Sequence, residues 1–434
     1  MDQSVVRVGL LGCGTVGAAL VEIVGEHADT IAARSGIRLE IARVAVRDLA
    51  KDRPVAFADG VLTDDADSLV VDPRVDVVVE LIGGMEPAHT LVRTALEAGK
   101  PVVTGNKELL ARAGAELADV ATKAGVDLLY EAAVAGAILS IRPLRQSLAG
   151  DRLRRVMGIV NGTTNYILTR MTDSGRSFDD ALDEAQALGY AERDPTADVE
   201  GHDAAAKAAI IASVAFGVQV RTDDVHCEGI TGVTPLDIAM AARLGYVVKL
   251  LAIVEAAPDP HGGPTDVAVR VHPAMVPAAH PLASVHDGYN AVFVEGEAAG
   301  ELMFYGRGAG GRPTASAVLG DLVDAAVNLR QGTAPAPSGL VPARIQPIEE
   351  LASQYYLTVD VVDRPGVLEK VAGATARHGV SILKMEQVGL GDEARLVLVT
   401  HTAGERDMQA TLDELRTLDE VDRVGTLLRV IGTG

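Results

Sequence analysis

One segment near the N-terminus constrains the fold of this chain more than any other. Residues 5–11 are mostly apolar, as expected of a buried strand, and a glycine-rich run leads from them into a helical stretch over residues 18–34. Such a turn exposes backbone N–H groups to a phosphate and lets the backbone approach it closely. A glycine-rich turn without a ligand is the alternative. The segment predicts a βα unit that binds a dinucleotide through Gly12, Gly14, Thr15, Val16 and Gly17.

Strands and helices alternate through the first third of the chain. The strand-like runs are residues 39–46, 75–82, 101–104 and 127–130, and the helical stretches between them are residues 88–98 and 107–123. This alternation predicts an α/β fold with a parallel, doubly wound, Rossmann-like sheet over residues 1–150. A second glycine-rich turn precedes a helical stretch at residues 315–329, which predicts that residues 305–335 return to this domain and that Gly310 contacts the cofactor. A packing turn explains the same glycines equally well.

The pattern changes after about residue 150. Strands are expected at residues 156–160, 247–254 and 267–271 and in a hairpin over residues 291–305, with several helices among them. This order predicts an α+β domain over residues 151–304, which would bind the substrate and form the dimer. The proline-rich residues 331–350 predict an extended linker. Residues 351–434 then follow the order βαββαβ and predict a small α+β sandwich.

Charge and composition exclude several classes of function. The chain has 39 Lys and Arg against 60 Asp and Glu, a net charge of −21, which excludes a general nucleic-acid binder. Its longest apolar stretch, residues 208–218, is far shorter than the roughly 18 residues that a membrane-spanning helix needs. Residues 1–4 lack the basic start of a signal peptide. The two cysteines form neither a disulfide framework nor a metal cluster, so we expect a cytoplasmic protein with no membrane partner.

The residue after the second strand bears on the choice of cofactor. Many dinucleotide sites carry an acid there that binds the ribose 2′-hydroxyl, whereas this chain has Arg47. An arginine can pair with a 2′-phosphate, which an acid would repel. Arg47 therefore favours NADP over NAD, although an ordinary solvated arginine in a mixed-charge stretch is the alternative.

Two lysines are candidates for acid–base chemistry. Asp203 and Lys207 lie four residues apart at a helix start, and the apolar residues 208–212 follow them. A lysine held by a carboxylate in a partly dry site can deliver a proton to an oxygen that gains charge as hydride arrives. Lys107 follows the strand at residues 102–104, at the edge of the sheet where α/β folds bind ligands. A surface ion pair for Lys207 and a surface charge for Lys107 are the alternatives.

At this point the chain resembles, over essentially its whole length, homoserine dehydrogenases that carry a C-terminal ACT domain. The motifs that carry the resemblance are Gly12-x-Gly14-x-x-Gly17, Gly105-Asn106-Lys107, Asn161 to Tyr166, Gly306 to Gly310, and Gly189, Asp194-Pro195, Asp198, Gly201, Asp203 and Lys207. The resemblance implies reversible reduction of L-aspartate 4-semialdehyde to L-homoserine with NADP or NAD. That step leads toward threonine, methionine and isoleucine.

The resemblance also implies roles for individual residues. It places Lys207 and Lys107 at the reacting oxygen, with Asp203 beside Lys207, and Lys107 also at the cofactor. The positions that it places around the amino-acid substrate are Glu192, Tyr190, Asp198, Gly162 and Thr163. Asn161 and Asn165 depart from the average pattern of the family, and we expect them to be tolerated polar variation in the substrate loop.

A monovalent cation site is a further implication of the resemblance. The matching positions, which follow the strand at residues 127–130, are Glu131, Val134, Gly136 and Ile138. The family builds this site from one carboxylate and several main-chain oxygens, and such hard ligands suit sodium.

The tail over residues 355–382 resembles an ACT domain, with the turn Asp363-Arg364-Pro365-Gly366 between a strand and a helix. Open N–H groups at a helix start can grip an amino-acid carboxylate, and such sites commonly form across a subunit interface. The resemblance therefore implies an amino-acid effector, with L-threonine as the expected one, and a homodimer or homotetramer. A tail used for oligomerisation alone is the alternative.

Two rival functions remain at this stage. Aspartate-semialdehyde dehydrogenase acts on the same metabolite but needs a thiolate nucleophile, and neither Cys13 in the glycine loop nor Cys227 after His226 is well placed for that role. A catalytically silent amino-acid sensor would keep the nucleotide fold for structure alone. It predicts no use for two lysines in the crevice.

Overall fold

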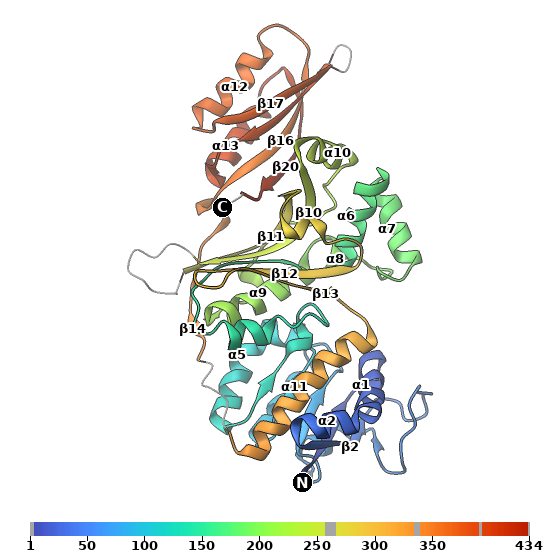
Figure 1. Cartoon of the computed structure of the whole chain (residues 1–434). Coiled ribbons are helices and arrows are strands. Elements are labelled where there is room, and N and C mark those ends of the chain that lie inside the picture. The colour runs from blue at the N-terminus through green and yellow to red at the C-terminus, as the bar shows by residue number, and fades with distance from the viewer. Residues whose placement is uncertain (1–3, 257–265, 334–338, 390–392, 433–434) are drawn as a thin grey trace.

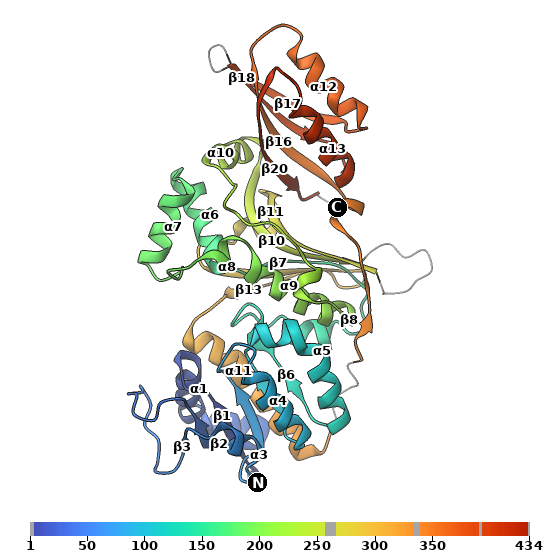
Figure 2. The same ribbon diagram turned by 180° about the vertical axis from the view of Figure 1, so that it is seen from behind.

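The computed structural model describes residues 4–256, 266–333, 339–389 and 393–432. Three modules follow one another along the molecule, with the N-terminal residues at one end and the C-terminal module at the other (Figures 1 and 2). The expectation about the first residues concerns positions 1–3, which lie outside the described residues, and so do Pro335 and Pro337 of the expected linker. Within the described residues, no helix is both long and apolar enough to cross a membrane.

The N-terminal module is built on a parallel sheet of strand order β3-β2-β1-β4-β5-β6. Its strands are β1 (Ser4–Leu11), β2 (Ile37–Ala45), β3 (Leu62–Thr63), β4 (Val77–Glu80), β5 (Val102–Thr104) and β6 (Leu128–Leu129). The strand order reverses between β1 and β4, so a crevice opens at the carboxyl ends of these strands. The doubly wound Rossmann-like sheet expected from the sequence is therefore confirmed.

Helices cover both faces of this sheet. They are α1 (Thr15–Glu26), α2 (Ala28–Ser35), α3 (Ala66–Val71), α4 (Ala88–Glu97) and α5 (Lys107–Ala124). The single helix expected over residues 18–34 is wrong, because the chain leaves helical geometry at His27 and α1 and α2 meet there. Gly25, a weak helix former, lies just before this break.

Helix α11 (Gly311–Gln331) lies on the same face as α1 and α2, far from them in sequence (Figure 1). Its apolar side chains recur at helical spacing, and Val318, Leu322 and Ala325 are fully buried in one core with Leu10 and Leu20. This burial removes a continuous apolar stripe from water, which fixes α11 to the parallel sheet.

The middle module is a mixed sheet covered by helices. Its strands are β7 (Leu153–Ile159), β10 (Tyr246–Ala256), β11 (Asp266–Pro277), β12 (Tyr289–Gly296) and β13 (Gly300–Arg307), with the short β8 (Val218–Gln219) and β9 (His226–Cys227). Its helices are α6 (Gly162–Ser174), α7 (Phe178–Ala187), α8 (Thr196–Val199), α9 (His202–Phe216) and α10 (Pro235–Leu244). Helix α9 lies between this sheet and the N-terminal module (Figures 1 and 2).

The C-terminal module has the expected βαββαβ order of an ACT domain. Its elements are β16 (Ala352–Val362), α12 (Val367–Arg377), β17 (Ile382–Gly389), β18 (Glu393–Thr400), β19 (Ala403–Gly404), α13 (Glu405–Leu415) and β20 (Val421–Val430). The sequence did not predict that β20 pairs with β11, where Ala274 lies opposite Arg429. The two modules therefore share one sheet of order β13-β12-β7-β10-β11-β20-β16-β18-β17.

The described part of the linker is extended but attached at two points. Strand β14 (Val341–Pro342) pairs with β8, and β15 (Arg344–Ile345) pairs with β11. Backbone hydrogen bonds thus join the linker to β8, which follows α9, and to β11 of the middle sheet.

Candidate active site

The glycine loop has the geometry that a dinucleotide site requires. Gly12 has a φ of +92°, and a Cβ there would lie 2.8 Å from the Leu81 carbonyl oxygen. A Cβ on Gly17 would collide with the Gly12 carbonyl, so both glycines are needed for the tight turn. Helix α1 begins at Thr15 without a side-chain cap, which leaves its first N–H groups available to an anion.

A cavity of about 480 Å³ lies at this loop. The N-terminus of α11 meets the N-terminus of α1 at its wall, since a Cβ on Gly311 would lie 3.0 Å from the Thr15 Cγ2 atom. Gly310 caps α11 with a φ of +130° and precedes that contact. The basic side chains that line the cavity are Lys51, Arg53 and Arg312.

Arg47 is not among the residues that line this cavity. It is exposed after the end of β2. The Arg53 guanidinium donates hydrogen bonds to the carbonyl oxygens of Lys51, at 2.7 Å, and Asp48. The loop after β2 is thereby folded so that Lys51 and Arg53 face the glycine loop. The prediction for Arg47 therefore stays a prediction, and Lys51 and Arg53 of the same loop are the basic residues that line the cavity.

A second cavity, of about 360 Å³, opens at the carboxyl ends of the parallel strands. Lys107 from the first turn of α5 and Lys207 from α9 both line it. Its other walls are glycine-rich segments from four separate places in the chain, represented by Gly84, Gly105, Gly136 and Gly308. The structure therefore brings together the two lysines that the sequence singled out.

Asp203 joins the two lysines. The Lys207 ammonium donates to its Oδ2 atom at 2.7 Å and to the Val160 carbonyl oxygen at 2.7 Å, while Lys107 pairs with its Oδ1 atom. Burial opposes ionisation of Asp203, but the charges of Lys207 and Lys107 outweigh it and hold the pKa of this carboxyl well below its usual range. The Asp203 side chain is 5% exposed and the Lys107 side chain 45%, so the cluster is dry on one side and open on the other.

The asparagines of the substrate loop are structural parts of the site, and the expectation that they are tolerated variation is wrong. The Asn161 side-chain NH₂ donates to Asp203 Oδ2 at 2.9 Å and to Asp198 Oδ1 at 2.6 Å. Its Oδ1 atom accepts the Thr164 N–H at 2.8 Å and caps α6. Asn165 is buried and its NH₂ donates to three backbone carbonyls. Neither amide could be replaced without leaving buried polar groups unpaired.

The residues expected at the substrate lie around the start of α6. Gly162 is the first residue of this helix, and the Thr163 hydroxyl donates to the Tyr190 carbonyl oxygen at 2.8 Å. The Tyr190 ring stacks on Tyr166 with centroids 4.5 Å apart, and its other side is partly exposed. Glu192 is exposed, and its carboxylate makes none of the hydrogen bonds or ion pairs seen in the described part of the chain. Among the residues expected at the substrate, Glu192 is the one whose side chain is not joined to the rest of the site by the hydrogen bonds and ion pairs of the described residues.

A buried carboxylate that the sequence did not reveal shapes the wall beside Lys107. Glu80, at the end of β4, is fully buried and accepts the N–H groups of Ile82 and Gly83 at 2.8 and 3.0 Å. Its other oxygen accepts the Thr104 hydroxyl, which in turn accepts the Asn106 N–H at 3.0 Å. The sequence feature that could have identified Glu80 is an acidic residue at the carboxyl end of a buried strand, three residues before Gly83-Gly84.

Asn106 completes this network. Its Oδ1 atom caps α5 by accepting the Leu109 N–H at 3.1 Å, and its NH₂ donates to the Gly84 carbonyl oxygen at 2.7 Å. The cap sets the residue at which α5 begins, and that residue is Lys107. The network thus fixes both the loop at residues 82–84 and the lysine that faces it.

The expected cation loop contains a carboxylate that is already occupied. Glu131 accepts the N–H groups of Ser140, Ile141 and Arg142 at 2.6, 2.8 and 2.7 Å. No three His, Cys, Asp or Glu side chains among the described residues gather so as to hold a metal. A cation here would therefore depend on main-chain oxygens.

Main-chain oxygens are available in this loop. Val134, Gly136 and Ile138 are buried, and their carbonyl oxygens accept none of the hydrogen bonds seen between described backbone groups. The nearby Ser140 hydroxyl is also buried without a partner. Buried carbonyls without donors fit a hard monovalent cation.

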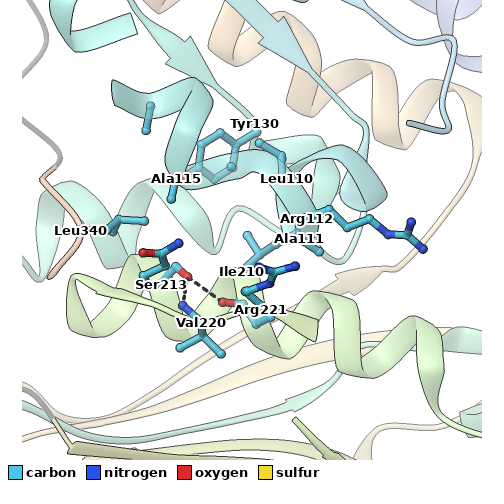
Figure 3. Close-up of a pocket in the computed structure, with 14 residues that line it drawn as sticks. Leu110, Ala111, Arg112, Ala115, Tyr130, Ile210, Ser213, Val220, Arg221 and Leu340 are labelled. Atoms are coloured by element: carbon cyan, nitrogen blue, oxygen red, sulfur yellow. Dashed lines mark hydrogen bonds between the residues drawn. The ribbon is translucent and has the colours of Figure 1, made fainter. Parts of the chain in front are cut away.

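A third, smaller cavity lies between α5 and α9. It measures about 60 Å³, room for a few water molecules, and Tyr130 reaches into it from above while Ile210 and Val220 close it from below (Figure 3). Leu340 of the linker forms one side. None of the residues expected at the substrate or the cofactor lines this cavity, and we assign no chemistry to it.

The cysteine chemistry that one rival function requires is disfavoured. Burial raises the pKa of Cys227 to about 11 and also raises the pKa of Cys13. Both thiols are therefore protonated near neutral pH and are poor nucleophiles. The crevice offers lysines instead.

Three family models match the chain. The model of homoserine dehydrogenase matches residues 140–323, the model of the homoserine dehydrogenase NAD-binding domain matches residues 12–131, and the ACT domain model matches residues 355–420. A homoserine dehydrogenase of Corynebacterium glutamicum is 50% identical to this chain over 428 residues, which cover 98% of this chain and 96% of that protein.

Solved structures agree with these matches. A crystal structure of a homoserine dehydrogenase from Thiobacillus denitrificans has a TM-score of 0.93 at 40% identity, and the match covers 100% of both chains. A hyperthermophilic archaeal homoserine dehydrogenase in complex with NADPH has a TM-score of 0.63 at 29% identity, with 74% of this chain and 97% of that chain covered.

Proposed function

The chain belongs to the homoserine dehydrogenase family, and on that premise we propose how its residues carry out the reversible reduction of L-aspartate 4-semialdehyde to L-homoserine. The observation that supports the assignment most directly is the convergence of Lys107 and Lys207 on one buried carboxylate, Asp203, beside an open cavity. A silent sensor would have no use for this arrangement.

We propose that Lys207 is the proton donor in the reduction and the acceptor in the reverse direction. Its ammonium is held by Asp203 and the Val160 carbonyl, which leaves one N–H free to face the cavity. The aldehyde oxygen gains negative charge as it is reduced, and a fixed ammonium stabilises that charge and supplies the proton. Lys107 adds a second positive charge to the same place, and Asp203 pairs with both lysines and orients them.

We propose that the amino-acid end of the substrate binds at the start of α6. The N–H groups of Gly162 and Thr163 begin this helix, where a carboxylate is favoured. Asp198 and Glu192 supply negative charge for the substrate ammonium, and Tyr190 covers it. The exposed position of Glu192 fits a residue that is paired only when substrate is bound.

We propose NADP as the preferred cofactor, which supplies the hydride when bound. The open N–H groups of α1 suit the pyrophosphate, and the cavity beside them carries Lys51, Arg53 and Arg312, with Arg47 on the same loop. Lys51 and Arg53 favour an added phosphate over a free hydroxyl, whereas Arg312 is paired with Glu26. The structural relative in complex with NADPH supports the same choice.

We propose that the loop over residues 131–138 holds a monovalent cation, sodium being the chemically suited one, at Glu131 and the main-chain oxygens of Val134, Gly136 and Ile138. The buried carbonyls without donors support this assignment. The cation would stiffen a wall of the lysine cavity, because Gly136 lines that cavity.

For the organisation of the chain we propose a nucleotide domain over residues 1–150 joined by residues 305–335, a substrate and dimerisation domain over 151–304, a linker over 331–350 and a regulatory domain over 351–434. The burial of α11 against the parallel sheet supports the first assignment. Two free cysteines suit the cytoplasm. A homodimer or homotetramer is the assembly that we propose.

We propose L-threonine as the effector of the ACT domain. Helix α12 begins after Gly366, which has a φ of +91° and offers no side-chain cap. The Val367 N–H donates to the Arg364 carbonyl oxygen, and the N–H groups of Leu368 and Glu369 that follow are open to a carboxylate.

The activity is tested by following NADPH absorbance with purified protein and L-aspartate 4-semialdehyde. We expect oxidation of NADPH that depends on the semialdehyde, and homoserine as the product. Absence of that oxidation with either NADPH or NADH would refute the assignment of the site.

A further inference from the structure

The loop over residues 285–289 packs against the proposed substrate residues, and we propose that Asn165 and Lys249 are positioning residues that fix this loop and thereby set the affinity for the amino-acid substrate. The inference rests on the proposed substrate site at Gly162 and Tyr190. It concerns two buried side chains that contact neither the lysine cluster nor the cavities described above.

Asn165 fastens the loop along its length. Its side-chain NH₂ donates to the carbonyl oxygens of Val285, Asp287 and Tyr289 at 3.3, 2.9 and 3.1 Å. These carbonyls belong to alternate residues, so a single amide holds the path of the chain over five residues. An alanine or a leucine here would remove this donor from the Asp287 and Tyr289 carbonyls and leave Val285 with Lys249 as its side-chain donor.

Lys249 fixes the orientation of that amide. Its ammonium is 1% exposed and donates to the Asn165 Oδ1 atom at 3.1 Å and to the Val285 carbonyl oxygen. An ammonium can only donate, so the amide oxygen must face it and the NH₂ must face the loop. Burial lowers the pKa of Lys249 to about 8, and the nearest negative charges, Asp173 and Asp287, make no ion pair with it. A buried lysine without a carboxylate partner is costly, which indicates a specific role.

Asp287, at the centre of the loop, shows how firmly the loop is held. It has a φ of +54°, in the left-handed region that is uncommon for residues other than glycine and that aspartate tolerates better than most. Its N–H donates to the Thr169 hydroxyl at 3.1 Å and its carboxylate pairs with Arg170 at 2.6 Å. Helix α6 thus supplies Asn165, Thr169 and Arg170 from one face to hold this residue.

The opposite side of the loop carries the contact with the substrate residues. A Cβ on Gly288 would lie 2.5 Å from the Tyr190 Cε1 atom, and a Cβ on Gly162 would lie 3.0 Å from the Gly288 carbonyl oxygen. The Tyr190 ring and the first peptide of α6 are therefore packed directly on the clamped loop. A shift of this loop moves both of them, whereas the glycine loop at Gly12 and the lysine cluster do not touch it.

The test compares the full-length enzyme with Lys249→Met and Asn165→Asp. The methionine removes the ammonium that orients the amide, and the carboxylate keeps a partner for Lys249 but loses the three donor contacts. We expect KM for L-homoserine to rise on the order of tenfold in each variant, with kcat and KM for NADP within about threefold of the parent. Lys100→Met is the matched control, because Lys100 is also a buried lysine bound to a carbonyl oxygen, that of Asp72, remote from the site.

A purely structural role gives a different result. If Lys249→Met and Asn165→Asp lower Tm as Lys100→Met does but leave KM for L-homoserine unchanged, the inference is wrong. Tyr190→Ala tests the premise separately: if that variant also leaves KM unchanged, the proposed substrate site has failed rather than the clamp. Gly288→Ala guards against loss of folding in the other variants, since it displaces the Tyr190 ring without removing a buried hydrogen bond. Gly288→Ala should raise KM for L-homoserine. If Tyr190→Ala raises this KM but Gly288→Ala leaves it unchanged, the inference is also wrong.

Discussion

The molecule has two junctions between its modules, and each brings buried charges together in a different way. Where the nucleotide-binding module meets the middle module, Asp203 pairs with Lys107 and Lys207 beside a cavity of about 360 Å³. The carboxylate comes from one module and one of its lysines from the other. The cluster is therefore complete only when the two modules are in contact, and one of its sides remains open.

The junction with the ACT domain uses arginine in place of lysine. Arg429 is buried and donates to both oxygens of Glu405 at 2.8 and 2.9 Å, and it lies 2.9 Å from Glu228 of the middle module. The Tyr355 hydroxyl also donates to Glu405, at 2.9 Å. A lysine can give up its proton at moderate cost, whereas an arginine cannot. The difference indicates that the first junction performs chemistry and the second holds two modules together.

The largest effect that we expect is on kcat at the lysine junction, where a catalytic role and a purely structural role predict different results. Lys207→Met removes the proposed proton donor, so kcat should fall by about 10²–10⁴-fold. Cofactor affinity and Tm should change little, because Asp203 keeps its pair with Lys107. Steady-state kinetics, cofactor titration and thermal unfolding measure the three quantities. Lys207→Arg keeps the charge but cannot release a proton, and it should be nearly as inactive; near-normal kcat in either variant would make Lys207 a structural ion pair.

The opposite pattern is expected at the arginine junction. Arg429→Met leaves Glu405 buried without its cation, which typically costs about 3–5 kcal/mol of unfolding free energy. The kcat measured well below the new Tm should stay within a few-fold of the parent, since Arg429 touches no residue of the lysine cavity. Denaturant unfolding and kinetics at low temperature measure both effects. A loss of kcat without a loss of stability would reverse the comparison.

The same junction predicts an acid-sensitive contribution to stability. Burial opposes ionisation of Glu228, but His226 and Arg429 outweigh it and lower its pKa to about 2 from an ordinary value of 4.5. A carboxyl with a lowered pKa stabilises the folded state above its unfolded-state pKa, and that stability is lost as pH falls. The parent should therefore lose stability as pH falls from about 4.5 to 2, and Glu228→Gln should flatten that part of the profile.

The two junctions also differ in how far the sequence predicted them. Asp203 and Lys207 share one helical turn and Lys107 follows a strand, so short-range spacing and strand order placed all three. Arg429, Glu405 and Glu228 have no such spacing, because Arg429 meets Glu405 through the fold of the ACT domain and meets Glu228 only when β20 joins β11 in one sheet. That pairing is a long-range event without a local pattern.

Side chains whose partners are backbone groups were missed for a related reason. Asn165 binds carbonyls about 120 residues away, and carbonyls carry no residue identity that a sequence could reveal. Glu80 likewise accepts N–H groups and a hydroxyl rather than a cation. The overall α/β order, the glycine loop and the βαββαβ tail were predictable because each depends on local periodicity and turn residues.

Removal of the C-terminal tail tests whether the junction with the ACT domain only holds the two modules together. A chain that ends near residue 345 should keep activity toward homoserine and lose inhibition by L-threonine, a coupling that is typically 5–150-fold in affinity where it exists, about 1–3 kcal/mol. It should also be less stable, because removal of β20 exposes an edge of β11 and leaves Glu228 without Arg429. Activity against threonine concentration for both chains is the measurement. If threonine does not inhibit the full-length enzyme, the tail serves assembly alone and the proposed effector is wrong.

The smallest expected effect is on cofactor binding, and it concerns an arginine that faces a cavity and not a carboxylate. Arg53 lines the cavity at the glycine loop and its guanidinium is held by two backbone carbonyls, whereas Arg47 is exposed and does not line that cavity. Arg53→Ala should therefore weaken NADP binding about tenfold or more while NAD binding changes little, since only NADP carries the 2′-phosphate.

Arg47→Ala is the matched control, and it should change the NADP to NAD ratio by less than about threefold, as a solvated charge does. Fluorescence titration of both cofactors gives the four dissociation constants. If Arg47→Ala has the larger effect, the loop after β2 closes differently around the bound cofactor and the arginine first indicated by the sequence is the correct one. Equal weakening of NADP and NAD binding by Arg53→Ala would instead mean that Arg53 has a structural role and holds the loop backbone in place. Arg53 would then resemble Arg429 in stabilising the fold, and the contrast between the two arginines would fail.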